Sequence, residues 1–179
     1  MTAGRAIAAE EASAALLAVM GRPGASFESR IAGTSMAPTI PDGAAIRVRP
    51  LGAQGAEAGE VLACVSRGGT LFAHRAVRQL RRAGIDWTLT VGDGWILCDS
   101  PTPAGRIVGV VHEFEAGAGW QPVGPAAARG PIVTGVSRAS VAFVAAMLRL
   151  HPVLAQHLAG GCLHVGARLK ALRRRLRRG

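Results

Sequence analysis

Short apolar runs separated by glycine- and proline-rich turns fill the chain between residues 26 and 115. Runs of this length, with turn residues such as Pro41-Asp42-Gly43 between them, are typical of β-strands joined by tight connections. The pattern predicts a mainly β fold in the form of a partly closed β-barrel. The expected strands are residues 27–32, 45–48, 60–66, 70–75, 87–91, 95–98 and 107–114.

A helix is expected before this core. Residues 6–20 are rich in Ala, Leu and Met, and the Gly and Pro residues at 21–24 end the run. Residues 1–25 therefore predict a short N-terminal helix. The run contains Glu10 and Glu11 and is too short to span a membrane.

The composition changes after Glu115. Residues 116–131 are rich in Gly, Ala and Pro and predict a linker. Residues 132–179 predict a helical basic tail, with a first helix over 138–150. In residues 162–178 the apolar side chains recur three and four positions apart, which places them on one face of a helix between arginines. This stripe consists of Val165, Leu169, Leu172 and Leu176.

The net charge of +10 belongs to this tail. Residues 1–115 hold 11 Arg and all 11 acidic residues, whereas residues 116–179 hold nine Arg, Lys170 and no Asp or Glu. Such a segment favours an anionic partner: a phospholipid surface, a nucleic acid or an acidic protein. A solubilising arginine tail without a partner is the alternative.

Three cysteines, Cys64, Cys98 and Cys162, are present, and no secretory signal pattern is apparent. An odd number fits a reducing cytoplasm better than a disulfide framework. Cys64 and Cys98 lie in apolar runs, so we expect them to pack as small hydrophobic residues. No group of Cys and His has the spacing of a zinc site, and we expect neither a metal nor a cofactor.

The most informative segment is GTSMAPTIPDG, residues 33–43. Ser35 stands between the end of a predicted strand and a proline-containing turn. Its hydroxyl would be held at a fixed angle, and backbone N–H groups around it can face a developing oxyanion. An ordinary turn serine beside a buried methionine is the alternative.

This segment resembles the nucleophile motif of the signal peptidase I superfamily, which includes membrane signal peptidases and self-cleaving repressors. Gly33, Ser35, Met36, Pro38 and Gly43 occupy positions of that motif. The resemblance covers residues 26–115 and implies a serine peptidase with Ser35 as the nucleophile. The later matching segments are residues 59–63, 73–77, 92–99 and 105–111.

The same resemblance implies that His74 is the general base. Most bacterial members of the family carry a lysine at this position, 39 residues after the serine, but the only lysine of this chain is Lys170. Histidine is the feature of the endoplasmic-reticulum and archaeal branch. An imidazole titrates near neutrality without the strong desolvation that a neutral lysine needs.

A histidine base needs a carboxylate on its other ring nitrogen, and two are available. Asp93 lies in a Gly-Asp-Gly turn, and Asp99 lies six residues further on. The spacing in the histidine branch favours Asp99, with Asp93 second. The alternative roles are a turn former for Asp93 and a cap before Ser100-Pro101 for Asp99.

The oxyanion hole implied by the resemblance uses the backbone N–H of Ser35. Some signal peptidases add a hydroxyl two residues before the nucleophile, where this chain has Gly33. Thr34 and Ser66 are the alternative side-chain donors.

Neither familiar role of the superfamily transfers directly, because the serine motif is preceded by no spanning helix and by too few residues for a helix-turn-helix. We expect a cytoplasmic bacterial endopeptidase that processes a protein or a leader-bearing peptide. Residues 162–178 would attach it peripherally to an anionic membrane surface. Nucleic acid is less favoured, since the tail has no interleaved aromatic residues. A catalytically inactive peptide-binding relative and a nucleic-acid-associated regulator are the alternatives, and no oligomeric state is predicted.

Overall fold

The structure is a computed structural model that describes residues 26–53, 55–67, 69–117, 119–124, 131–151 and 155. The expected N-terminal helix (residues 1–25) and the expected amphipathic stripe (residues 162–178) lie outside the described residues.

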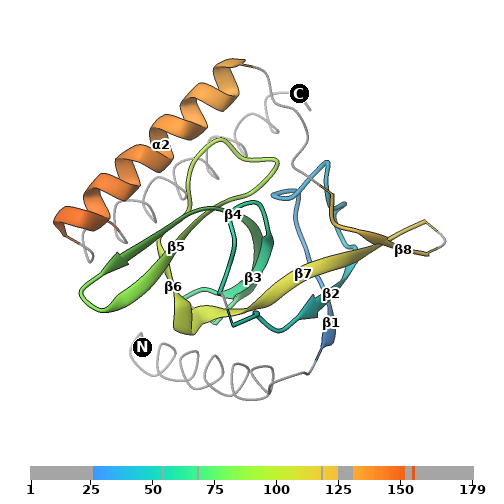
Figure 1. The fold of residues 1–179 in the computed structure, drawn as a ribbon. Coiled ribbons are helices and arrows are strands. Elements are labelled where there is room, and N and C mark those ends of the chain that lie inside the picture. Colours follow the sequence, from blue (N-terminus) through green and yellow to red (C-terminus); the bar gives the residue numbers. More distant parts are fainter. Residues whose placement is uncertain are drawn as a thin grey trace, which may run out of the picture.

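Eight antiparallel strands form one sheet that curls into a half-barrel (Figure 1). The spatial order is β1-β2-β7-β3-β4-β5-β6, and β8 pairs with β7. The mainly β prediction is therefore confirmed. The strands are β1 (Phe27–Arg30), β2 (Ala45–Arg49), β3 (Val61–Val65), β4 (Leu71–Arg82), β5 (Ile85–Val91), β6 (Thr102–Pro103), β7 (Ile107–Ala116) and β8 (Gly119–Pro122).

One expected strand, residues 95–98, was wrong: this stretch is a loop of turns and bends. The backbone N–H of Trp95 bonds back to Gly92, and that of Asp99 bonds to the carbonyl of Thr90 at 2.9 Å. The chain therefore folds back on the end of β5 instead of continuing outward. A short 3-10 helix, Ala104–Arg106, then leads into β7.

The predicted linker over residues 116–131 was also wrong in part, because β8 lies within it. Gly117, with φ of +61°, turns the chain back so that β8 pairs with the end of β7, Glu115 opposite Trp120. The guanidinium carbon of Arg47 lies 3.9 Å from the Trp120 ring centroid, a cation–π contact that fastens β8 to β2. The glycine and proline content reflects a tight hairpin here.

Apolar clusters cover both faces of the half-barrel at β3. Successive side chains of a strand point to opposite faces, and all five residues of β3 are buried. Val61, Ala63 and Val65 pack in one cluster with Ile46, and Leu62 and Cys64 in the other. Both faces of β3 are therefore shielded from solvent. This strand pairs with β4, which carries the candidate base His74.

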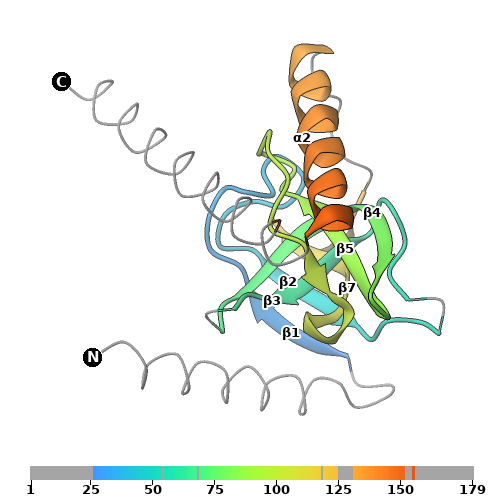
Figure 2. The same ribbon diagram turned by 90° about the vertical axis from the view of Figure 1, so that its left-hand side faces the viewer.

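A helix, α2 (Pro131–Leu150), lies across the β4–β5 side of the sheet (Figure 2). Its buried residues Val144, Ala145 and Leu148 pack against Trp87 and Leu89 of β5. It includes the expected helix over residues 138–150 and begins seven residues earlier. Among the described residues, no helix combines the length and apolarity that a membrane span needs.

Candidate functional site

The loop between β1 and β2 presents Ser35 on a rigid support. Met36 and Ile40 are fully buried in the cluster between the strands. Gly33 has a φ of +107°, which favours glycine, and its N–H bonds to a carboxylate oxygen of Asp42 at 2.6 Å. The buried side chains anchor the loop from below, so the partly exposed Ser35 is held at the surface. This is the structural role of the predicted motif residues Gly33 and Met36.

The remaining motif residues continue the turn. The N–H of Ala37 bonds to the carbonyl of Thr34 at 3.3 Å, and the peptide bond between Ala37 and Pro38 is cis. The hydroxyl of Thr39 is buried and has no hydrogen-bond partner among the residues that the structure describes. Pro38 itself is exposed, so it shapes the loop without packing into the core.

His74 lies in the first half of β4, opposite Leu62 of β3, with 6% of its surface exposed. The ring of Phe72 meets it edge-on with centroids 5.3 Å apart, and the ring of Trp95 lies 5.8 Å away. These neighbours exclude water from most of the imidazole. A dry environment of this kind strengthens the polar contacts that the ring makes.

Asp99 occupies one nitrogen of this imidazole. His74 Nδ1 donates to Asp99 Oδ2 at 2.5 Å, and both side chains are buried. The hydroxyl of Thr90 donates to the same oxygen at 2.7 Å, while the Asp99 backbone N–H is bonded to the Thr90 carbonyl. Because Nδ1 carries the proton of this bond, Nε2 is the ring nitrogen that can accept one.

A glycine turn brings the serine loop and the imidazole together. A methyl group on Gly92 would lie 2.6 Å from the carbonyl oxygen of Ser35 and 3.1 Å from Nε2 of His74. The N–H of Gly94 also donates to the Ser35 carbonyl at 2.7 Å. Ser35 and the Nε2 side of His74 therefore both lie directly against Gly92.

The Ser35 hydroxyl and the His74 imidazole lie near each other but are not hydrogen-bonded in the described part of the chain. Within the described part of the chain, no hydrogen bond links Ser35 Oγ to His74 Nε2, and the Ser35 N–H donates to no protein group. Catalytic hydrogen bonds are often long before substrate binds and tighten in the complex. The Ser35 N–H remains available to an incoming oxygen.

Asp93, the second predicted partner of His74, serves another residue. Its carboxylate receives two bonds from the guanidinium of Arg75, from Nε at 2.9 Å and from Nη2 at 2.7 Å. His74 and Arg75 are consecutive on β4 and point to opposite faces. Of the two candidate carboxylates, the structure therefore places the favoured Asp99 on His74 and the second candidate, Asp93, on Arg75, where its bonds support the Gly92–Gly94 turn.

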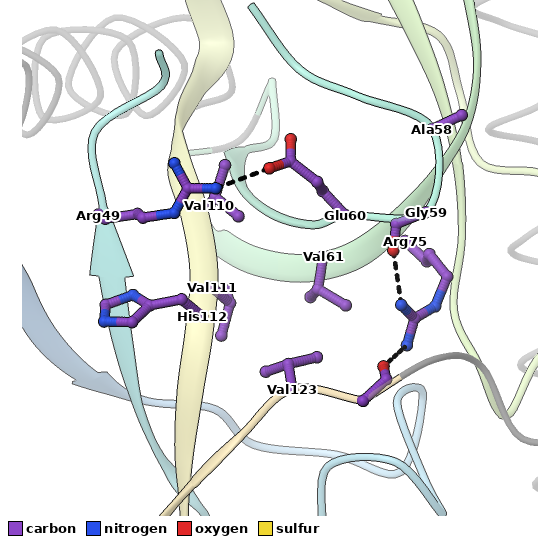
Figure 3. A pocket seen from close by; sticks show the side chains of 11 residues that line it. Arg49, Ala58, Gly59, Glu60, Val61, Arg75, Val110, Val111, His112 and Val123 are labelled. Atoms are coloured by element: carbon purple, nitrogen blue, oxygen red, sulfur yellow. Dashed lines mark hydrogen bonds and ion pairs between the residues drawn. The ribbon is translucent and has the colours of Figure 1, made fainter.

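Arg75 also lines a cavity of about 330 Å³ behind the site (Figure 3). Nη1 of Arg75 donates to the carbonyl of Gly59 at 2.6 Å, and Nη2 donates to that of Gly124 at 3.2 Å. Apolar side chains such as Val61 and Val123 line part of the cavity, and Arg49, Glu60 and His112 line it as well. Among the predicted site residues, none lines this cavity.

Both described cysteines are buried, as predicted. Burial, and then the negative charge of Asp99, raises the pKa of the Cys64 thiol to about 12. The same two causes raise the pKa of Cys98. Neither thiol is thus a thiolate nucleophile near neutral pH. Among the described residues, no His, Cys, Asp and Glu cluster could hold a metal ion.

Several contributors to this site were missed from the sequence. In the sequence, Thr90 is one polar residue of an expected strand and Arg75 is the residue after His74. Neither position indicates the bonds that these residues make to Asp99 and Asp93. The Gly-Asp-Gly pattern at 92–94 was interpreted as a turn, although it also shows where two segments approach closely. Ser66, an alternative oxyanion donor, instead accepts the Thr70 N–H at 3.1 Å in the β3–β4 turn.

No family model matches the chain, and no curated protein matches it. The functional argument therefore depends on the geometry of the site and on the chemistry of its residues.

Proposed function

We propose that the protein is a serine endopeptidase in which Ser35 is the nucleophile, His74 the general base and Asp99 the residue that orients the base. The described half-barrel would be the peptidase core. The observation that carries the proposal is the buried bond between His74 and Asp99, with Nε2 of the same ring directed at the glycine that supports Ser35. A buried imidazole held by a carboxylate, beside a serine whose hydroxyl is bonded to none of the described residues, is the arrangement that acyl transfer requires.

The proposed reaction follows from these positions. When a peptide carbonyl approaches, Nε2 of His74 takes the Ser35 proton while Oγ bonds to the carbonyl carbon, and the N–H of Ser35 stabilises the oxyanion. The imidazolium, stabilised by Asp99, then gives its proton to the leaving amine as the peptide bond breaks. Water, deprotonated by the same nitrogen, releases the acyl group and restores Ser35.

Reaction with a fluorophosphonate probe tests the nucleophile without knowledge of the substrate. We expect Ser35 to be labelled in the native protein, and we expect Ser35→Ala and His74→Ala to lose the label. Ser66→Ala is the matched control, because Ser66 is also a turn serine but lies in the β3–β4 turn. Undiminished labelling of Ser35→Ala would reject the assignment.

Acid sensitivity tests the base. Protonation of Nε2 removes the lone pair that accepts the serine proton, so labelling should fall as the solution is acidified. A labelling rate that stays constant on acidification while the protein remains folded would exclude a histidine base. Absence of labelling at any pH would favour the alternative proposal, a peptide-binding protein without catalytic activity.

A further inference from the structure

Helix α2 carries a second apolar face besides the one that packs on the sheet. Its members recur three or four positions apart, so they share one side of the helix. Phe143 is 55% exposed and Leu150 is 72% exposed, values that are high for large apolar side chains. The face consists of Ala139, Ala142, Phe143, Ala146 and Leu150, all exposed.

Arginines border this outer face, and no acidic group lies near it in the sequence. Arg138 and Arg149 are exposed and stand about three helical turns apart, on the same border of the stripe. Residues 116–179 contain no Asp or Glu and carry the whole net charge of +10. The partner of the face must therefore offer both negative charge and an apolar medium.

We propose that α2 docks with this face on an anionic phospholipid membrane. An apolar stripe bordered by arginines lies in the interface of such a membrane, with the arginines among the headgroups. A second copy of the chain fits less well, since the arginines of both copies would meet without a carboxylate between them. Nucleic acid would pair with the arginines but would leave Leu150 in water.

This surface is connected to the candidate site. The hydroxyl of Ser140 on α2 accepts the N–H of Cys98 at 3.1 Å, and Asp99 is the next residue. Ile96, on the same loop, is 45% exposed. Docking of α2 would thus hold the loop of the orienting carboxylate at the membrane. The docking inference does not depend on the proposed catalytic activity.

An environment-sensitive fluorophore on the outer face tests the inference. Phe143→Cys is made in a Cys162→Ser background, where Cys64 and Cys98 are buried and stay unlabelled, and is coupled to a nitrobenzoxadiazole dye. Vesicles of phosphatidylcholine with about 30% phosphatidylglycerol should brighten the dye and shift its emission to the blue. Gln121→Cys is the control, because β8 lies on the other side of the molecule from α2 (Figure 1).

A variant with unchanged net charge tests the same face without an attached fluorophore. Phe143→Ser with Leu150→Ser leaves every arginine in place and should weaken vesicle binding about tenfold or more, because two large apolar side chains no longer enter the membrane. The inference is overturned if the protein sediments with vesicles while the dye at position 143 stays in water. It is also overturned if the protein binds duplex DNA and no vesicles.

Discussion

At the scale of single residues, Gly92 decides whether the two parts of the candidate site can meet. A Cβ atom at this position would lie 2.6 Å from the Ser35 carbonyl oxygen, which is closer than real Cβ contacts. The same atom would lie 3.1 Å from the imidazole nitrogen that we propose as the base. Neither neighbour can yield easily, since one is backbone and the other belongs to a buried ring.

We expect Gly92→Ala to separate Ser35 from His74. Fluorophosphonate labelling should fall at least about 100-fold, since small misplacements of catalytic groups cost that much. Stability should fall by about 1–3 kcal/mol through overpacking. Gly105→Ala is the control, because nothing lies within 4 Å of a Cβ there. Equal labelling rates for the two variants would mean that Gly92 does not set the approach.

Thr90 donates its hydroxyl to Asp99, the carboxylate that we propose orients His74. Thr90→Val keeps the shape but removes the donor to Asp99, so we expect a loss of about 1.5–3 kcal/mol in unfolding free energy. Labelling of Ser35 should slow as well, because Asp99 is less firmly placed. Thr88→Val is the control on the same strand, since Thr88 is also buried. The assigned role is incorrect if both variants label at the wild-type rate.

At the scale of secondary-structure elements, Arg75 joins three parts of the fold. Its guanidinium bonds to Asp93 in the site turn, to Gly59 before β3 and to Gly124 after β8. The side chains of Arg75 and Asp93 are 9% and 2% exposed. Buried pairs of this kind are costly to break from one side, because the remaining charge loses its partner.

Arg75→Met should therefore lower the unfolding free energy by about 3–5 kcal/mol, measured by urea denaturation. Replacing Asp93 by Leu in the same chain should recover part of this loss, since no unpaired charge remains. Arg81→Met is the control: Arg81 and Asp86 form an exposed pair at 3.8 Å, and such pairs contribute about 0–1 kcal/mol. If the double variant lost as much unfolding free energy as the Asp93→Leu and Arg75→Met variants lose in sum, the two side chains would not be energetically coupled.

The sequence predicted most elements and their order but missed where hydrogen bonds override a pattern. Short apolar runs bounded by turn residues were sufficient to predict six of the seven expected strands. Residues 95–98 look like a strand, yet the return bond from Asp99 to Thr90 folds them into a loop. Glycine and proline after Glu115 look like a linker, yet Gly117 makes a hairpin of them. In both places hydrogen bonds to a neighbouring segment decide the structure, and the apolar or glycine pattern does not show which residues those bonds join.

For the site, the sequence named the residues but not all of their contacts. Ser35, His74 and Asp99 came from a resemblance in motif and spacing, and the structure brings them to one region. Which of Asp93 and Asp99 contacts His74 depends on which face of β4 each carboxylate meets. Arg75 binds Asp93 on the face opposite to His74, and nothing in the sequence distinguishes Arg75 as the partner of Asp93.

At the scale of the whole molecule, the two buried thiols lower the free energy of unfolding as the pH becomes alkaline. The pKa of Cys64 is raised to about 12 in the fold, against an ordinary value of 9.0. Between these values the unfolded thiol loses a proton that the folded thiol keeps, so stability falls as pH rises. Each thiol should cost about 1.4 kcal/mol per pH unit above its ordinary pKa.

Urea denaturation at a series of pH values from about 8 to 11 measures this effect. Cys64→Ala should show a smaller loss of stability per pH unit than the native protein, although it is less stable at neutral pH because of the cavity. The expectation fails if the native protein and this variant lose stability at the same rate.

The place of β7 between β2 and β3 determines when the proposed site can first assemble during synthesis. Ser35 follows β1, and His74 lies on β4, but the strand that joins their two halves of the sheet comes after both in the chain. A nascent polypeptide emerging from the ribosome must therefore hold its first two strands without their neighbour until residues 107–116 have been made. Such late closure over a long sequence separation slows folding, and we expect no catalytic competence in a chain that is still being synthesised before that point.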